Sequence, residues 1–177
     1  MPKRSLKGSL VRFDRKPIDP HDLIGFALEW ADELTLLQVV NADRMEPNGY
    51  CVIRNNDVRR WEPLGPETFM GRALRLKGIA PVFLDSLSLQ SWPNLLEAAG
   101  RSFPLITLRR EVMNPNVCYI GRVQSMTEKV VALKEIDPDA RWEGIRRYRF
   151  RDLTKVDFGG GYEAALMLVA VEKKRRR

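Results

Sequence analysis

His21 is the residue with the most obvious chemical potential, because it is the only histidine of the 177-residue chain and stands in the run Asp-Pro-His-Asp at residues 19–22. A histidine beside carboxylates could hold a metal ion or exchange protons with a substrate. A similar stretch at residues 114–116 reads Asn-Pro-Asn, with neither histidine nor carboxylate. Both stretches keep an Asx residue before proline, which is typical of a turn. We therefore interpret residues 19–22 as a surface turn and predict no catalytic residue or metal ligand there.

Two other patterns could do chemistry but lack the partners that the chemistry needs. The glycine run at residues 159–161 could cradle a phosphate with its backbone N–H groups, yet no GxxxxGK sequence follows. We interpret it as a stop after a strand, where the chain passes close to a neighbour. Asp137 and Asp139 flank a proline and provide too few oxygen ligands for calcium, so they indicate a turn. The chain also lacks a nucleophile–base pair and a cofactor fingerprint, and we expect a protein that is not an enzyme, with no cofactor and no metal.

Arg147, Arg149 and Arg151 alternate along one predicted strand. Guanidinium groups two residues apart are spaced by about 7 Å, which suits a phosphate backbone. The net charge of +7 lies at the ends, since residues 1–16 and 173–177 each carry +5 and the residues between them carry −3. The candidate nucleic-acid-binding residues are therefore Arg147, Arg149, Arg151, Lys173, Lys174 and Arg175. The alternative is a solubilising strand face that protects a sheet edge, together with a solvated tail.

Composition indicates an ordinary globular chain, with 44% hydrophobic and 30% charged residues. The longest apolar run, residues 164–171, falls far short of the roughly 20 residues of a membrane span. The basic start of the chain is followed by no apolar segment of a signal peptide. Cys51 and Cys118 stand in apolar or aromatic stretches outside any CxxC pair, so we expect both to be small buried hydrophobic residues. These features predict a cytoplasmic protein without a membrane segment.

The sequence repeats itself once, with low identity but constant order. The Asx-Pro motif followed by Ile-Gly occurs at residues 18–25 and again at residues 113–121. Further matches follow at the same shift, and each copy ends with an aromatic residue and Ala-Leu-x-Leu, at residues 69–76 and 162–168. Matches in the same order over about 65 positions indicate a tandem duplication.

Each copy has the pattern of short β-strands. In the second copy we predict strands at residues 105–110, 117–125, 130–136, 147–151 and 154–158, with Gly121 marking a bend or bulge. Residues 137–144 are predicted as a polar loop, and residues 162–171 as a helix. The connector contains one helix signal, with Ser91 as N-cap, Pro93 in the first turn and Gly100 as the stop.

A helix followed by five strongly bent strands resembles the Sm-like (LSm-type) small barrel. The resemblance rests on Gly121-x-Val123 before an apolar strand, and on residues 53–58 (Ile-Arg-Asn-Asn-Asp-Val), which are similar to the family's turn between its last two strands. It implies a mainly β protein with two tandem five-stranded barrels, and the alternative is one larger barrel or sandwich of all ten strands. The expected domains are a first barrel at residues 5–77, a linker with a short helix at 78–103, a second barrel at 104–171 and a basic tail at 172–177. The family's uridine-binding residues are not carried over, because Ala31 and Thr35 occupy their positions in the first copy.

We expect a non-catalytic binding module. One hypothesis is association with RNA through the basic ends and the arginine strand. The other is a protein-interaction or homo-oligomeric module whose barrels join through edge strands, without a role in nucleic-acid binding. The copies differ in charge, because Arg147, Arg149 and Arg151 align with Val52, Arg54 and Asn56. A phosphate-bearing ligand should therefore prefer the second copy. Trp61, which aligns with Val156, is assigned to packing and to the contact between barrels.

Overall fold

The computed structural model describes residues 6–85 and 87–175, with residues 173–175 described as backbone alone. The strands are β1 (Leu10–Asp14), β2 (Leu23–Trp30), β3 (Leu34–Asn41), β4 (Glu46–Arg54), β5 (Arg60–Pro63), β6 (Ile106–Arg109), β7 (Cys118–Met126), β8 (Val130–Ile136), β9 (Trp142–Arg149) and β10 (Lys155–Phe158). The helices are α1 (Phe69–Leu76), α2 (Trp92–Ser102) and α3 (Gly161–Arg175). Short 3₁₀ turns at Asn55–Asp57 and Phe150–Asp152 precede β5 and β10. We call β1–β5 with α1 the first repeat, and β6–β10 with α3 the second repeat.

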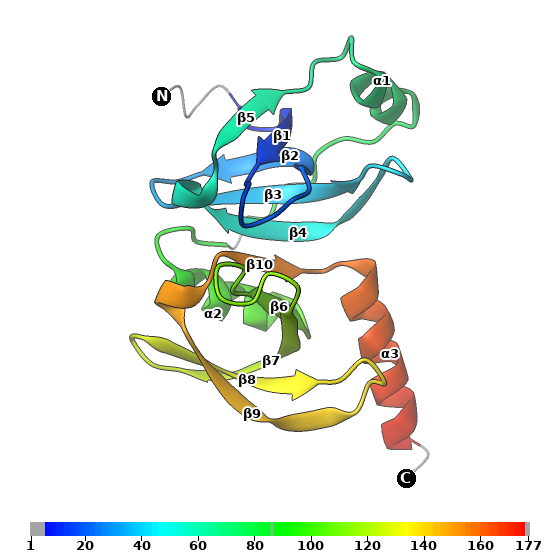
Figure 1. The fold of residues 1–177 in the computed structure, drawn as a ribbon. Helices are drawn as coiled ribbons and strands as arrows, with labels where there is room; N and C mark the ends of the chain where they lie inside the picture. Colours follow the sequence, from blue (N-terminus) through cyan, green and yellow to red (C-terminus); the bar gives the residue numbers. More distant parts are fainter. Residues whose placement is uncertain (1–5, 86, 176–177) are drawn as a thin grey trace.

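The ten strands form one antiparallel sheet in the order β5-β1-β2-β3-β4-β10-β6-β7-β8-β9. The prediction of a mainly β protein is confirmed. The prediction of two closed barrels is not confirmed, because the strands of both halves belong to one continuous hydrogen-bonded sheet. β4 of the first repeat pairs with β10 of the second, with Val52 opposite Val156. Figure 1 shows the first repeat above the second, with this strand pair at their boundary and α2 beside it.

The duplication predicted from sequence recurs in the strand register. Phe13 pairs with Leu23 in the first repeat, and Leu108 pairs with Tyr119 in the second. The irregularity between β2 and β3 falls after Ala27, and that between β7 and β8 falls after the equivalent Val123. Because a bulge bends and twists a strand, bulges at matching positions give the two halves the same curvature.

Gly25 and Gly121 occupy equivalent positions and have the same structural role. A Cβ atom at Gly25 would lie 2.4 Å from the carbonyl oxygen of Gln38, and one at Gly121 would lie 2.2 Å from that of Lys134. The strands therefore approach more closely than a side chain allows, which is why glycine is required there. The close approach of β7 and β8 therefore explains the glycine at the bend predicted at Gly121. The bulge itself lies two residues later, after Val123.

Most element boundaries lie close to the sequence prediction. The strand predicted at residues 147–151 ends earlier, at Arg149, because Phe150 and Arg151 belong to a 3₁₀ turn. Helix α2 begins after Ser91, whose hydroxyl accepts a hydrogen bond from the N–H of Asn94 at 3.3 Å, as the capping signal predicted. The prediction of a loop at residues 137–144 is wrong at its end, because β9 already begins at Trp142, opposite Ile136. Helix α3 extends past the predicted end at residue 171 to Arg175, so part of the expected basic tail is helical.

The largest hydrophobic cluster is shared by both repeats. It contains Leu36 and Val52 from the first repeat, Leu108 and Val156 from the second, and Leu95 from α2. All five side chains are at most 1% exposed. The repeats are therefore joined by a common core as well as by backbone pairing, and α2 stabilises both.

Candidate functional site

The three predicted arginines lie at the outer edge of the sheet. Arg147 and Arg149 alternate with buried Tyr148 on β9, the last strand in the sheet order. Arg151 follows in the 3₁₀ turn, with its Nε atom 3.7 Å from a carboxylate oxygen of Asp152. The predicted alternation, with aromatic residues inward and arginines outward, is confirmed, because Phe150 is buried as well.

Arg149 and Arg151 contribute to a hollow between two turns of the second repeat. The hollow has a volume of about 530 Å³ and is lined by Glu128, Lys129, Val130, Arg149, Phe150 and Arg151. The two turns are joined by a hydrogen bond from the N–H of Phe150 to the carbonyl oxygen of Lys129, at 3.1 Å. Three cationic side chains thus surround one concave surface, which favours an anionic ligand.

In the first repeat, the two equivalent turns are joined by a side chain. Asn55, the equivalent of Phe150, donates hydrogen bonds to the carbonyl oxygens of Ala31 and Asp32, at 2.9 and 3.0 Å. It also accepts a hydrogen bond from the hydroxyl of Thr35 at 2.6 Å. The amide therefore ties the two turns together, and this bridge is lost where phenylalanine replaces asparagine. Sequence reasoning identified the charge difference between the repeats but not this difference in hydrogen bonding.

The backbone of residues 173–175 is not near Arg149 and Arg151. Helix α3 packs beside Trp142 at the start of β9, through Leu166 and Ala170. Arg149 is the last residue of that strand and Arg151 lies in the turn after it, on the opposite side of the second repeat (Figure 1). The backbone of Lys173, Lys174 and Arg175 continues α3, and their side chains lie outside the described part. The six candidate residues therefore do not form one continuous surface.

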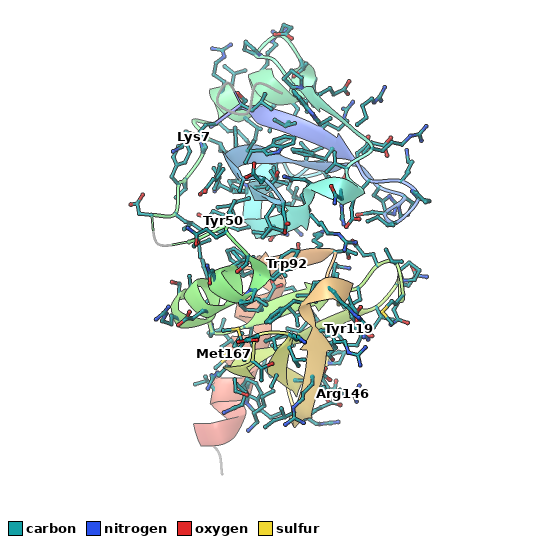
Figure 2. The ribbon with its side chains drawn as sticks, turned by 90° about the vertical axis from the view of Figure 1, so that its left-hand side faces the viewer. Lys7, Tyr50, Trp92, Tyr119, Arg146 and Met167 are labelled. Atoms are coloured by element: carbon teal, nitrogen blue, oxygen red, sulfur yellow. The ribbon has the colours of Figure 1, made fainter. Side chains whose placement is uncertain are left out.

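A buried polar network supports the arginine strand from inside the second repeat. The guanidinium of Arg110 lies 4.8 Å from the ring centre of Tyr119 and 5.1 Å from that of Tyr148. The hydroxyl of Tyr148 donates a hydrogen bond to the buried carboxylate of Glu135. Burial, and then this hydrogen bond, raise the pKa of Tyr148 above its ordinary value. Arg146 of β9 pairs with the same carboxylate at 3.3 Å, so these contacts hold β9 against β8, the strand that carries Glu135. Figure 2 shows Tyr119 and Arg146 among these residues.

The boundary between the repeats contains an ion pair that sequence reasoning missed. Arg15 is fully buried, and both of its terminal nitrogens donate to the carboxylate of Glu111, which is 5% exposed. The hydroxyl of Thr154 donates to the same carboxylate at 2.8 Å. Nothing in the local sequence marks Arg15 as buried, because only tertiary folding places residues 96 positions apart in contact.

A second charged group lies at the same boundary, beside a hollow of about 260 Å³. Arg109 pairs with Asp157 at 3.0 Å, and Lys155 pairs with the same carboxylate at 3.2 Å. Burial alone would lower the pKa of Lys155, but the charge of Asp157 raises it above its ordinary value. Both cations are therefore held in their charged form by a carboxylate, which indicates a structural role.

The weaker candidate motifs have the structural roles expected for them. The N–H of His21 donates to the carboxylate of Asp19 at 3.0 Å, which closes the predicted turn. The N–H of Arg141 likewise donates to Asp137 at 2.7 Å. The glycine run passes close to β4, where a Cβ atom at Gly49 would lie 2.5 Å from the nitrogen of Gly160.

Within residues 6–85 and 87–175, no cluster of at least three histidine, cysteine or acidic residues could hold a metal ion. In that same part of the chain, no helix has the length and apolar character needed to cross a membrane.

The two cysteines differ, and the expectation that both are buried is wrong for one of them. Cys51 is fully buried on β4, whereas Cys118 is exposed at the start of β7. Cys118 is the first residue of its strand and lines the boundary hollow, so no element covers it. Burial raises the pKa of the Cys51 thiol to about 12.

We expect one thiol of the native protein to react with Ellman's reagent at mildly alkaline pH, and two after unfolding. The pKa of Cys51 is higher in the folded state than in the unfolded state, so its thiol adds stability below about pH 8.5 that is lost as the pH rises toward 12. A Cys51→Val variant should lose this dependence, while Cys118→Ser should lose the native reactivity. Two rapidly reacting thiols in the native protein would contradict the burial of Cys51.

Comparison with protein-family models, with curated proteins and with solved structures found no match.

Proposed function

We propose that this chain is a non-catalytic assembly module, in which two Sm-like repeats join further copies of the chain through the outermost strands β5 and β9. The pairing of β4 with β10 supports the proposal most directly. It joins the fourth strand of one repeat to the fifth strand of the other. The fourth strand of the second repeat (β9) and the fifth strand of the first (β5) end the sheet without a partner in the described chain. A strand edge of this kind is a template for another chain.

The internal pairing gives the register of the proposed contact. Tyr50 pairs with Phe158 and Cys51 with Asp157 across the boundary between the repeats. The equivalent pairs between two chains are Ile145 with Pro63, Arg146 with Glu62, and Arg147 with Trp61.

These pairs are chemically compatible. Arg146 meets the opposite charge of Glu62, and Arg147 meets an indole ring that can hold a guanidinium by a cation–π contact. Ile145 is 54% exposed on its strand, so pairing with a second chain would bury apolar surface. It would pack on Pro63, as Tyr50 packs on Phe158 with 5.9 Å between ring centres.

Trp61 was assigned both to packing and to the contact between the repeats, and the second assignment is wrong. It packs edge-on against Trp30, with ring centres 5.6 Å apart, so its assignment to packing is correct. It lies on β5 at the far edge of the sheet, however, and the repeats meet at β4 and β10. Under the proposal its remaining surface contacts a second chain. The contact joins different surfaces of the two chains, so repeated addition closes a ring or extends a filament.

Size-exclusion chromatography with light scattering tests the proposal. We expect a defined oligomer for the native chain and a lower mass for Ile145→Glu, because a carboxylate on the edge strand opposes pairing. Val112→Glu is the matched control, since Val112 is 64% exposed in the loop after β6 and should leave the oligomer intact. A monomer at high protein concentration, or equal effects of the two variants, would contradict the proposal.

A second candidate function is association with RNA through the hollow of the second repeat. The observation that favours it is the gathering of Lys129, Arg149 and Arg151 at one concave surface, where they outnumber the single carboxylate of Glu128. Arg149 and Arg151 lie beyond the residues of the proposed strand pairing, whereas Arg147 belongs to it, so the two functions share that residue.

A further inference from the structure

The two repeats differ in what covers the outer face of their second and third strands. Phe26 of β2 pairs with Gln38 of β3, and the equivalent pair in the second repeat is Arg122 with Lys134. In the first repeat, the segment after α1 crosses this face. The N–H of Val82 donates to the side-chain oxygen of Gln38 at 2.8 Å. Ile79 lines the same hollow as Phe26.

In the second repeat the same face forms an uncovered groove. Its volume is about 420 Å³, and it lies between the strands and helix α3. Arg122 and Lys134 are exposed along it, 5.2 and 5.7 Å from the ring centre of Trp142. Met167 of α3 forms part of its apolar wall. No described segment lies across this face as residues 79–82 do in the first repeat.

We propose that this groove binds an extended, acidic peptide segment of a partner protein. The covering segment of the first repeat shows that a chain in irregular conformation fits this face. The polarity of the anchoring group is reversed, because Gln38 accepts a backbone N–H whereas Lys134 can only donate. Its partner must therefore present a carbonyl or a carboxylate.

The remaining groups of the groove define the ligand further. The guanidinium of Arg122, which replaces Phe26, suits a carboxylate because it can donate two parallel hydrogen bonds. Met167, Ala170 and Val171 of α3 provide an apolar wall for aliphatic side chains. Successive side chains of an extended peptide point in opposite directions, so acidic and aliphatic residues in alternation match the two walls. Lys134 pairs with Ile145 across β8 and β9, and Trp142 belongs to β9, so this groove borders the proposed assembly edge.

A labelled synthetic peptide tests the proposal. The probe has the length of residues 79–90 and alternates glutamate with valine, and the control probe replaces each glutamate by lysine. We expect the acidic probe to raise fluorescence anisotropy and to shift the NMR signal of the Trp142 indole N–H, and the basic probe to do neither. The Trp142 signal is assigned by a Trp142→Phe variant.

Matched variants locate the binding. Arg122→Glu with Lys134→Glu should weaken binding of the acidic probe by at least about tenfold, because two attractive charges become repulsive. Arg44→Glu with Arg72→Glu makes the same change of net charge at exposed residues of the first repeat, and should alter binding by less than about twofold. Circular dichroism verifies that both variants fold. The proposal is overturned by equal losses in the two variants, by absence of binding at millimolar probe, or by a Trp142 shift with a single-stranded RNA instead of the peptide.

Discussion

Replacing Glu111 by leucine is expected to destabilise the fold by about 3–5 kcal/mol, because it removes the buried carboxylate to which both terminal nitrogens of Arg15 donate and leaves only the longer contact with Asp19, at 3.7 Å. Arg15 is fully buried, and its Nε atom already lacks a hydrogen-bond partner among the described atoms. The guanidinium cannot lose its proton at accessible pH, so the protein has to accommodate the charge or let water enter between the repeats. Urea unfolding followed by tryptophan fluorescence measures the effect.

Two further variants separate the ion pair from the general effect of mutation. Arg15→Met combined with Glu111→Leu should recover most of the lost stability, because an apolar pair of similar volume removes the desolvation penalty of both ions. Glu97→Leu is the matched control, since Glu97 pairs with Arg101 at 3.1 Å on the surface and should cost no more than about 1 kcal/mol. If Glu111→Leu costs no more than Glu97→Leu, the pair does not hold the repeats together.

Replacing Arg147, Arg149 and Arg151 by serine is expected to remove most of the affinity for single-stranded RNA, if the second repeat is the nucleic-acid-binding half. Each phosphate contact contributes about 0.7 to the slope of log affinity against log salt on a single strand, so three lost contacts should lower the slope by about two. At low salt the affinity itself should fall by more than tenfold. Fluorescence anisotropy with a labelled oligonucleotide, repeated at several salt concentrations, provides both values.

The control removes the same charge from exposed positions of the first repeat, with Arg59, Arg60 and Arg72 replaced by serine. Arg54 is left unchanged, because it pairs with Asp57 at 2.9 Å and donates to the carbonyl oxygen of Arg151 across the boundary. Equal losses from the two variants would reject the asymmetry between the repeats. No binding by the native chain at low salt would eliminate the RNA hypothesis and leave the assembly function.

The sequence alone determined the features that depend on local preference and on patterns within one segment. The alternation of Arg147, Tyr148 and Arg149 predicted a strand with its aromatic residue inward, because side chains of a strand point alternately to opposite faces. Ser91 predicted the start of α2, because its hydroxyl satisfies an N–H group at the helix end. The repeated motifs predicted a duplication whose equivalent strands now share register and bulges.

Tertiary structure decided how the repeats meet and which surfaces remain open. Whether five strands close on themselves or pair with the next five depends on contacts between β4 and β10, which lie far apart in the chain. The burial of Arg15 by Glu111 and the exposure of Cys118 have the same origin. The sequence also could not reveal that residues 79–82 cover Phe26 and Gln38 while Arg122 and Lys134 line an open groove. Local patterns specify which face a side chain points to, and only the assembled fold specifies what lies opposite that face.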